Sequence, residues 1–337
     1  MFKHFTKQFS SAFKQSPTRK PYSTYYYFGG QKANNSFQLI TLTPQNKKWL
    51  IIGGVALSFT IVSHIEEAPV THRRRIMLTP NWVENRTAST SYNAVKQEFG
   101  PLILPENHRV TRRVRSIMVR LIKAAENYYD PETGKTVNLF EDMKSHSIPV
   151  LDWEICVIDD SRRPTPNAFV VGNGKVFVFT SILPLAANDD GLATVLAHEL
   201  GHQLAHHIGE KLTKSPFIYS IALLLSATFQ SPSFASLATN ILLDMPFSRE
   251  METEADYIGL MLMSKACFNP HEAPRFWERM LKFEQSMGSV PEILSDHPSS
   301  ERRNKNILEW IPQADHIYEM ANCGPTGSYW TGFNMGF

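Results

Sequence analysis

The stretch GLATVLAHELGHQLAHHIG, residues 191–209, decides how this chain folds. Its apolar residues recur at helical spacing, which predicts a buried helix from about Gly191 to about Gly209. Within that helix, His198 and His202 stand four residues apart, so both imidazoles project from one face and can reach a single metal ion. A buried helix with two unpaired histidines would be costly, so the pair requires a partner.

Glu199 follows the first histidine and completes the pattern HExxH. Zinc held by such a pair lowers the pKa of a water molecule toward neutrality and polarises a carbonyl, while the glutamate takes the proton and later passes it to the leaving amine. That chemistry is peptide-bond hydrolysis. The structural alternative is two core histidines satisfied by hydrogen bonds and a glutamate on the surface.

The metal site needs a third ligand, and the residues that follow the motif do not supply one. A metzincin would require a glycine and a third histidine where Ala205 and Ile208 stand, so metzincin chemistry is excluded. His206 and His207 are consecutive and therefore point apart, and we interpret both as residues of the helix surface.

Residues 248–256, SREMETEAD, predict a second helix that supplies the third ligand. Apolar residues gather on one side of this helix, namely Met251, Ala255, Ile258, Gly259, Leu262 and Met263. Glu252 lies nearest to that side, and with the two histidines of the motif it would bind one zinc ion per chain. Glu250 and Glu254 lie further round and fit a solvated acidic face.

Two charged residues near Glu252 fit supporting roles. Asp256 lies one turn later on nearly the same line, and we expect it to hold the free nitrogen of a zinc-bound histidine. Arg249 is expected to brace one of these carboxylates. Together they would form a second layer around the metal ligands.

HELGH followed by SRxxExxAD resembles the HtpX-like gluzincin metallopeptidases. The whole stretch from about Asp152 to about Leu308 is similar to their catalytic domain. This resemblance implies an α+β fold, a zincin-like metallopeptidase domain that is mostly helical with a small sheet.

Two further segments resemble elements of that family. Asn167-Ala168-Phe169, followed by the turn Gly172-Asn173-Gly174 and the strand-like run 175–179, is similar to the family's edge hairpin before the active-site helix. The β-branched and aromatic residues around the turn indicate strands by themselves. Because such an edge can take a substrate backbone as an added strand, the resemblance implies that Asn167, Ala168 and Phe169 bind substrate.

Downstream, His297-Pro298 with Arg303 resembles the family's HPxxxxR element. The resemblance implies that His297 is a second catalytic residue, which stabilises the oxyanion, and that Arg303 braces the site. A histidine-proline turn that opens a helix explains the same letters structurally.

The amino-terminal region indicates a targeting segment and a membrane anchor. From Met1 to Ile65 there is no Asp or Glu, and basic residues alternate with Phe, Ser and Thr, which is typical of a mitochondrial presequence over about residues 1–40. Residues 49–65, WLIIGGVALSFTIVSHI, are uncharged and mostly apolar and predict one short transmembrane helix. A buried soluble helix is the alternative.

Among HtpX-like enzymes, a presequence, one span and a carboxy-terminal peptidase look most like the mitochondrial inner-membrane Oma-type peptidases. The resemblance implies that residues 79–337 form a catalytic domain facing the intermembrane space, in a single-pass protein that forms a homo-oligomer. It also implies an ATP-independent zinc metalloendopeptidase that cuts inner-membrane proteins in quality control and stress-responsive processing. The chain has no P-loop, so its substrates must offer segments that are already accessible.

Other function classes fit less well. The net charge of +2 conceals a purely basic start and a slightly acidic remainder, so no global basic surface for nucleic acid is present. A non-catalytic zinc-stabilised membrane scaffold or chaperone would have no use for the general base Glu199. A prenyl-protein peptidase usually needs a chamber of several spans.

Three other features carry expectations. Residues 108–123 predict an amphipathic basic helix, for which packing on the domain is favoured over binding to lipid headgroups. Residues 217–243 contain apolar runs shorter than a normal span, which favours buried helices over a membrane-dipping hairpin. Cys156 fits a core strand, whereas Cys267 and Cys323 are hypothesised to pair, because the intermembrane space permits disulfides.

Overall fold

The computed structural model describes residues 43–130, 133–141, 153–216, 220, 246–287 and 301–323. The predicted presequence at 1–40, the interval 217–243 apart from Ser220, and His297 lie outside the described residues. The chain divides into two compact units, residues 1–54 and 55–337, and each is described by itself.

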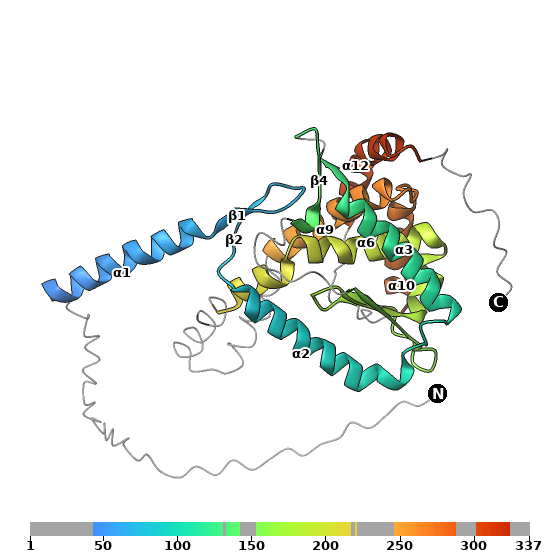
Figure 1. Cartoon of the computed structure of the whole chain (residues 1–337), viewed down its shortest axis with the longest axis horizontal. Helices are drawn as coiled ribbons and strands as arrows, with labels where there is room; N and C mark the ends of the chain where they lie inside the picture. Colours follow the sequence, from blue (N-terminus) through green and yellow to red (C-terminus); the bar gives the residue numbers. More distant parts are fainter. Residues whose placement is uncertain are drawn as a thin grey trace, which may run out of the picture. The chain divides into compact units, whose positions relative to one another are not determined.

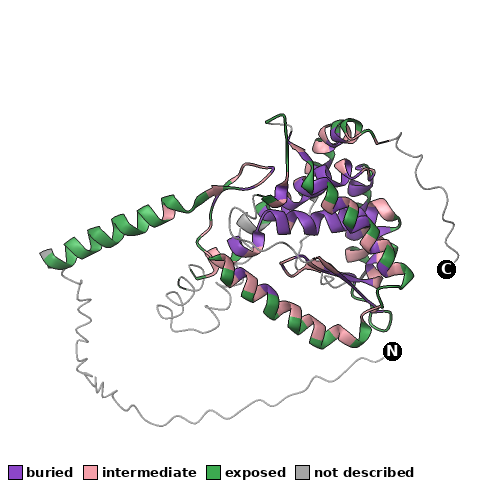
Figure 2. Ribbon diagram, viewed as in Figure 1, coloured by how far each residue is buried: buried purple, intermediate pink, exposed green. Residues whose placement is uncertain are grey.

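Helix α1, Pro44–Ser63, contains most of the span predicted at 49–65 (Figure 1). The helix ends before Ile65 because that residue begins strand β1. The large apolar side chains of α1 are exposed (Figure 2). Of the helices that the structure describes, none is both long enough and apolar enough to cross a membrane.

A short hairpin follows α1. Its strands β1, Ile65–Glu67, and β2, Arg74–Ile76, pair antiparallel. The loop between them buries Ala68 and Val70, and Arg75 of β2 is also buried, so the hairpin is part of the folded domain. Helix α2, Asn81–Phe99, and the 3-10 turn η1, Gly100–Leu102, come next.

A three-stranded sheet forms from β5, Glu154–Ile158, β6, Ala168–Val170, and β7, Lys175–Phe179. Its order is β5-β7-β6, with β5 parallel and β6 antiparallel to β7, so β6 is an edge strand as predicted. The connecting turn needs positive φ at Gly172 (95°), Asn173 (49°) and Gly174 (75°), residue types that accept this conformation.

Alternation along the strands gives the sheet two different faces. Val176 and Val178 point into the main core with the helices, whereas Phe177 and Phe179 pack with Tyr92 and Phe99 of α2 on the other face. This small sheet among many helices agrees with the predicted α+β class.

The remaining elements are one central helix, α6, and the elements packed around it. They are α3, Arg109–Glu126, the hairpin β3, Tyr128–Asp130, and β4, Lys135–Val137, the short η2, Thr180–Ile182, and α5, Leu183–Ala186, and the helices α6, Asp189–Leu204, α9, Pro246–Lys265, α10, Glu272–Met287, and α12, Glu301–Met320. Helix α6 contacts α3, α9, α10 and β6 and is buried along nearly its whole length (Figures 1 and 2).

The predicted central helix is shifted relative to the observed one. The observed helix, α6, begins at Asp189, because the side chain of Asn188 caps it by accepting a hydrogen bond from the Gly191 N–H. It ends at Leu204 and not near Gly209, because His206 has a positive φ of 50°. A new helical segment, 207–216, follows this break.

The predicted basic helix and the hypothesised cysteine pair are both present in the structure. The basic helix predicted at 108–123 is α3, whose apolar face is buried and whose Arg120 lies 3.7 Å above the Phe268 ring, so it packs within the protein. Cys267 and Cys323 form a disulfide that joins the ends of α9 and α12, with 5.3 Å between their Cα atoms, and Cys156 is buried in β5.

Candidate metal centre

Helices α6 and α9 bring the predicted metal ligands together. His198 and His202 project from α6 and Glu252 from α9, and all three side chains are largely buried. The helices approach closely because Gly259 of α9 has no side chain: a Cβ there would lie 2.9 Å from the backbone of Ala197 and His198. The ligand set thus depends on two helices that are held at backbone contact.

The spacing of the three donors fits one tetrahedral metal ion. The Nε2 atoms of His198 and His202 are 3.1 Å apart. Oε2 of Glu252 lies 3.4 Å from Nε2 of His198, and Oε1 of Glu252 lies 3.5 Å from Nε2 of His202. Ligand atoms about 2.05 Å from a zinc ion at tetrahedral angles are about 3.3 Å from one another. Two imidazoles and one carboxylate leave a fourth position for water or substrate, as in catalytic zinc sites.

A carboxylate and a guanidinium support the first histidine. Oδ1 of Asp256 lies 3.0 Å from Nδ1 of His198, the nitrogen that faces away from the other donors. Arg303 binds both oxygens of Asp256, at 2.7 and 2.8 Å, and its NH1 lies 3.4 Å from Glu252. The structure therefore brings Asp256 and Arg303 to the metal donors, as expected from the sequence.

The two histidines have different electrostatic surroundings. Burial opposes protonation of His198, but the hydrogen bonds to Asp256 and Glu252 outweigh it and raise its pKa to about 9. Burial lowers the pKa of His202 well below its ordinary value. A metal ligand must be a neutral imidazole, so metal uptake would release a proton from His198.

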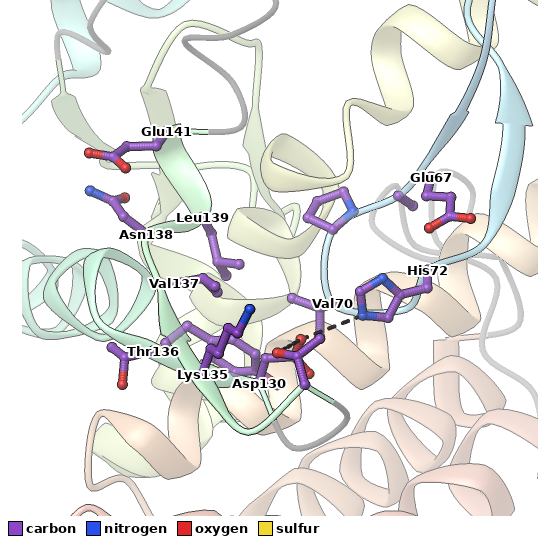
Figure 3. A pocket seen from close by; sticks show the side chains of 14 residues that line it. Glu67, Val70, His72, Asp130, Lys135, Thr136, Val137, Asn138, Leu139 and Glu141 are labelled. Carbon is purple, nitrogen blue, oxygen red and sulfur yellow. Dashed lines mark hydrogen bonds and ion pairs between the residues drawn. The ribbon is translucent and has the colours of Figure 1, made fainter.

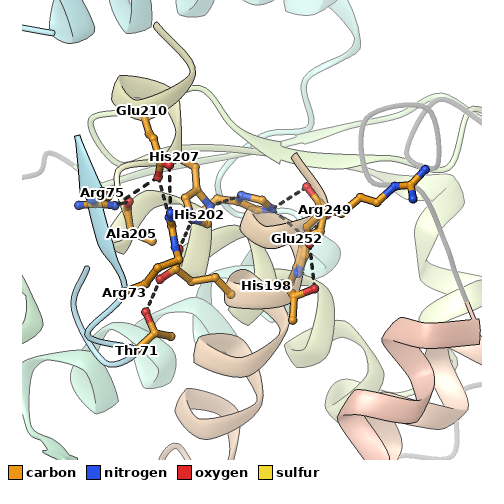
Figure 4. Close-up of polar contacts among 12 residues, drawn as sticks. Thr71, Arg73, Arg75, His198, His202, Ala205, His207, Glu210, Arg249 and Glu252 are labelled. Carbon is orange, nitrogen blue, oxygen red and sulfur yellow. Dashed lines mark hydrogen bonds and ion pairs between the residues drawn. The ribbon is translucent and has the colours of Figure 1, made fainter. Parts of the chain in front are cut away.

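His206, His207 and Glu254 were interpreted as surface residues, and all three interpretations are wrong. They are buried, with exposures of 9%, 1% and 4%. Nδ1 of His207 lies 2.7 Å from Nδ1 of His202, and its Nε2 lies 3.0 Å from Glu254 (Figure 4). The break at His206 explains the error, because consecutive residues point apart only while one helix continues.

Other residues of the site also had no signal in the sequence. Trp277 of α10 packs beside the site, with its ring 5.8 Å from that of His198 in an edge-to-face arrangement and 4.0 Å from the Arg303 guanidinium. Arg73, from the loop between β1 and β2, reaches Glu254 across 181 residues of sequence. Apolar periodicity describes neighbours on one element and does not detect such distant contacts.

The remaining predicted site residues differ in their placement. Glu199 follows His198 on α6 and is buried. Arg249 is exposed and extends away from the metal donors (Figure 4), whereas Arg303 is the arginine that contacts Asp256 and Glu252. His297 lies outside the described residues.

The predicted substrate-binding residues lie on or beside edge strand β6, which packs against α6. Asn167 and Ala168 are buried, and Phe169 packs against Phe177 with 5.4 Å between ring centroids. Their side chains are thus occupied within the domain. The backbone of this edge strand is what these residues can present to a peptide.

The cavity drawn in Figure 3 is separate from this constellation. It has a volume of about 600 Å³ and lies between the β1–β2 loop and the β3–β4 hairpin, where His72 and Asp130 are 3.6 Å apart. Its lining includes none of the metal donors.

Comparisons with known proteins agree with this geometry. Residues 136–311 match peptidase family M48. The chain is 41% identical over 315 residues to the mitochondrial metalloendopeptidase OMA1 of Saccharomyces cerevisiae, with 90% of this chain and 86% of the relative covered. It is 42% identical over 275 residues to the protein of that name in Schizosaccharomyces pombe (81% and 74% covered). It is 29% identical over 309 residues to the metalloendopeptidase OMA1 of Homo sapiens (86% and 55% covered).

Proposed function

Because the chain belongs to peptidase family M48, among the mitochondrial metalloendopeptidases of the OMA1 type, we propose that it hydrolyses peptide bonds with one zinc ion held by His198, His202 and Glu252. The observation that carries this proposal is the set of donor distances, 3.1, 3.4 and 3.5 Å, between the three side chains. They match the edges of a tetrahedral site that has one position left open.

The side chains present can perform the reaction around that ion. A bound zinc ion polarises the scissile carbonyl and lowers the pKa of a water molecule. Glu199 is proposed as the general base, which accepts a proton from the attacking water and delivers it to the leaving amine. Asp256 fixes His198 in one orientation, and Arg303 holds Asp256 and balances the local negative charge.

Substrates are proposed to bind as an added strand along β6. The three residues of this edge pair with β7 on one side. Backbone hydrogen bonds along the other side would give affinity with little dependence on sequence. This mode suits a peptidase that removes damaged or stress-marked proteins of different sequences, and we propose inner-membrane proteins as its substrates.

We further propose that α1 anchors the enzyme in the mitochondrial inner membrane with a single pass, as a homo-oligomer whose catalytic domain faces the intermembrane space. Large apolar side chains along α1 are more than half exposed, which water disfavours, including Trp49, Leu50, Ile51, Ile52, Val55, Leu57, Phe59 and Val62. Carbonate extraction of the full chain and of a chain that begins at Glu66 tests the anchor. Release of the full chain into the soluble fraction would contradict it.

The function itself is tested with purified full-length protein and an unfolded membrane-protein segment as substrate. Wild type should cut this segment and lose activity under chelation. Glu199→Gln should bind the same amount of zinc and not cut, because it keeps the metal ligands and lacks the base. Cutting by both proteins would contradict the role of Glu199, and zinc binding without cutting by either would favour a zinc-stabilised scaffold.

A further inference from the structure

A second, largely buried cluster adjoins the metal donors on the side of His202 (Figure 4). It consists of His207, Glu210, Glu254 and Arg73. NH2 of Arg73 lies 2.6 Å from a carboxylate oxygen of each glutamate, and Glu210 has a second cation, Lys214, at 2.6 Å. Both glutamates of the cluster are therefore paired with cationic side chains.

A second metal ion is the first candidate for this cluster. The donor atoms of His207, Glu210 and Glu254 lie within 4.8 Å of one another. However, the two carboxylates already face two cationic side chains, Arg73 and Lys214. Buried carboxylates that are paired in this way have no uncompensated charge for a divalent ion to neutralise.

The hydrogen-bond directions indicate a different role. When Nε2 of His202 binds a metal, its lone pair is used, so its proton is on Nδ1. This N–H needs an acceptor with a lone pair, and Nδ1 of His207, which lies 2.7 Å away, can accept from it. His207 then carries its own proton on Nε2, which donates to Glu254 at 3.0 Å. Each donor thus meets one acceptor, from the metal ligand to the carboxylate.

We propose that His207 is a positioning residue of the metal centre, which fixes the orientation and tautomer of His202, and that Arg73 holds this arrangement through Glu254. This inference rests on the proposed zinc site. Metal-bound histidines usually donate their second N–H to a carboxylate or carbonyl, and that partner orients the ring. Here a histidine stands between the ligand and the carboxylate.

The two metal histidines are therefore supported by parallel arrangements. His198 is held by Asp256 and Arg303, all within α6, α9 and α12. His202 is held by His207, Glu254 and Arg73. Each ends in an arginine that binds the carboxylate, which keeps the carboxylate ionised and fixed in place.

Arg73 differs from Arg303 in its origin, because it comes from the hairpin that directly follows α1. The same hairpin makes other contacts at this place: Thr71 donates to Glu254, and Arg75 donates to the carbonyl of Ala205 at the end of α6. The hairpin thus helps to support the metal site. Substitutions in the hairpin, more than 120 residues before the HExxH motif in the sequence, can therefore remove its contribution.

The test measures zinc affinity of the full-length protein in detergent, by competition with a chromophoric chelator. His207→Phe keeps a ring but removes the acceptor, and we expect a dissociation constant about 10–100-fold higher. His207→Asn offers an amide oxygen near the place of Nδ1 and should recover most of the loss. The visible spectrum of the cobalt-substituted protein should change in His207→Phe, because it reports on ligand geometry at the metal.

Arg73 provides a matched pair, because its neighbour Arg74 is exposed and pairs only weakly with Glu67 at 3.4 Å. Arg73→Met should weaken zinc binding about 10-fold, and Arg74→Met should leave it unchanged. If His207→Phe fails to fold, as judged by circular dichroism of the metal-free protein, the comparison of Arg73→Met with Arg74→Met tests whether the support of His202 affects zinc binding.

The outcomes separate this inference from the proposed function. Zinc binding by His207→Phe within about threefold of wild type, with an unchanged cobalt spectrum, would overturn the positioning role alone. Equal loss in the Phe and Asn variants would also overturn it, because the acceptor would then not be the cause. Absence of zinc binding by the wild type would overturn the proposed function and this inference together.

Discussion

Gly201 of α6 lies directly against Ala255 of α9. A Cβ at Gly201 would be 2.9 Å from the carbonyl oxygen of Ala255, closer than real Cβ atoms approach, and 3.2 Å from its Cα, which is a tight contact. The glycine of HELGH is therefore a requirement of the helix crossing. Backbone contact at this point, together with that at Gly259, sets the distance between the histidines of α6 and the carboxylates of α9.

Gly201→Ala should destabilise the protein although alanine favours helices. In an open helix this change stabilises by about 1 kcal/mol. Here the added methyl group meets backbone atoms, and overpacking of this kind costs about 1–3 kcal/mol. We expect a lower melting temperature in circular dichroism and weaker zinc binding, because the helices must separate.

Gly100→Ala is the matched control for this prediction, since no heavy atom lies within 4 Å of a Cβ placed there. It should leave the melting temperature unchanged or raise it slightly, because Gly100 already has helical φ and ψ. If Gly201→Ala melts at or above the temperature of the wild type, the close crossing is not a constraint on the fold.

The parts of the site that could be predicted lie on single elements with regular periodicity. His198 and His202 share one face of α6, and the apolar face of α9 singles out Glu252 and Asp256. Strand β7 was predicted with the bounds that it has, because aromatic and β-branched residues follow a glycine-rich turn.

The parts that could not be predicted depend on breaks and on distant contacts. His207 lies under His202 only because His206 adopts a positive φ, which histidine seldom does and no pattern announces. Glu254 is buried where Arg73 pairs with it, and that arginine lies between the predicted span at 49–65 and the predicted domain at 79–337. Trp277 reaches the site from α10, which carries no motif.

Asp256→Asn should weaken metal binding by about 10–100-fold, because the neutral amide holds the His198 ring less firmly and Arg303 loses the carboxylate that it binds through both oxygens. Chelator competition measures the effect. Asp315→Asn is a suitable control, since it changes an exposed carboxylate that pairs with His271 at 3.0 Å. Equal affinities in both variants would exclude a supporting role for Asp256.

The disulfide between Cys267 and Cys323 should stabilise the domain. It closes a loop of 56 residues, and removing such a bond typically costs about 2–4 kcal/mol, because the unfolded chain gains freedom. We expect the double variant Cys267→Ser, Cys323→Ser to unfold at lower denaturant concentration than the wild type.

Electrophoresis checks that the bond is present. The wild type should migrate faster without reductant than with it, and the double variant should lose this difference. Cys156→Ser should retain the difference, because Cys156 is a buried free cysteine. Identical mobility of the wild type under both conditions would contradict the bond.

The acid stability of the domain should depend on Glu154 at the start of β5. Burial tends to raise its pKa, but Lys96 at 2.9 Å and the Tyr92 hydroxyl at 2.8 Å outweigh burial and lower the pKa to about 2. A carboxyl whose pKa is lower in the folded state stabilises that state above its unfolded pKa. This contribution is therefore complete above about pH 4.5 and is lost as the pH falls toward about 2.

Glu154→Gln should consequently melt at a lower temperature than the wild type at neutral pH, and the difference should shrink as the pH is lowered through this window. Melting curves at intervals between pH 7 and the lowest pH at which the protein stays folded measure it. The exposed Glu126 offers a control, since Glu126→Gln removes a carboxylate of α3 that is not part of this cluster. A difference between Glu154→Gln and wild type that is constant with pH would show that packing, and not the charge, accounts for the effect of Glu154.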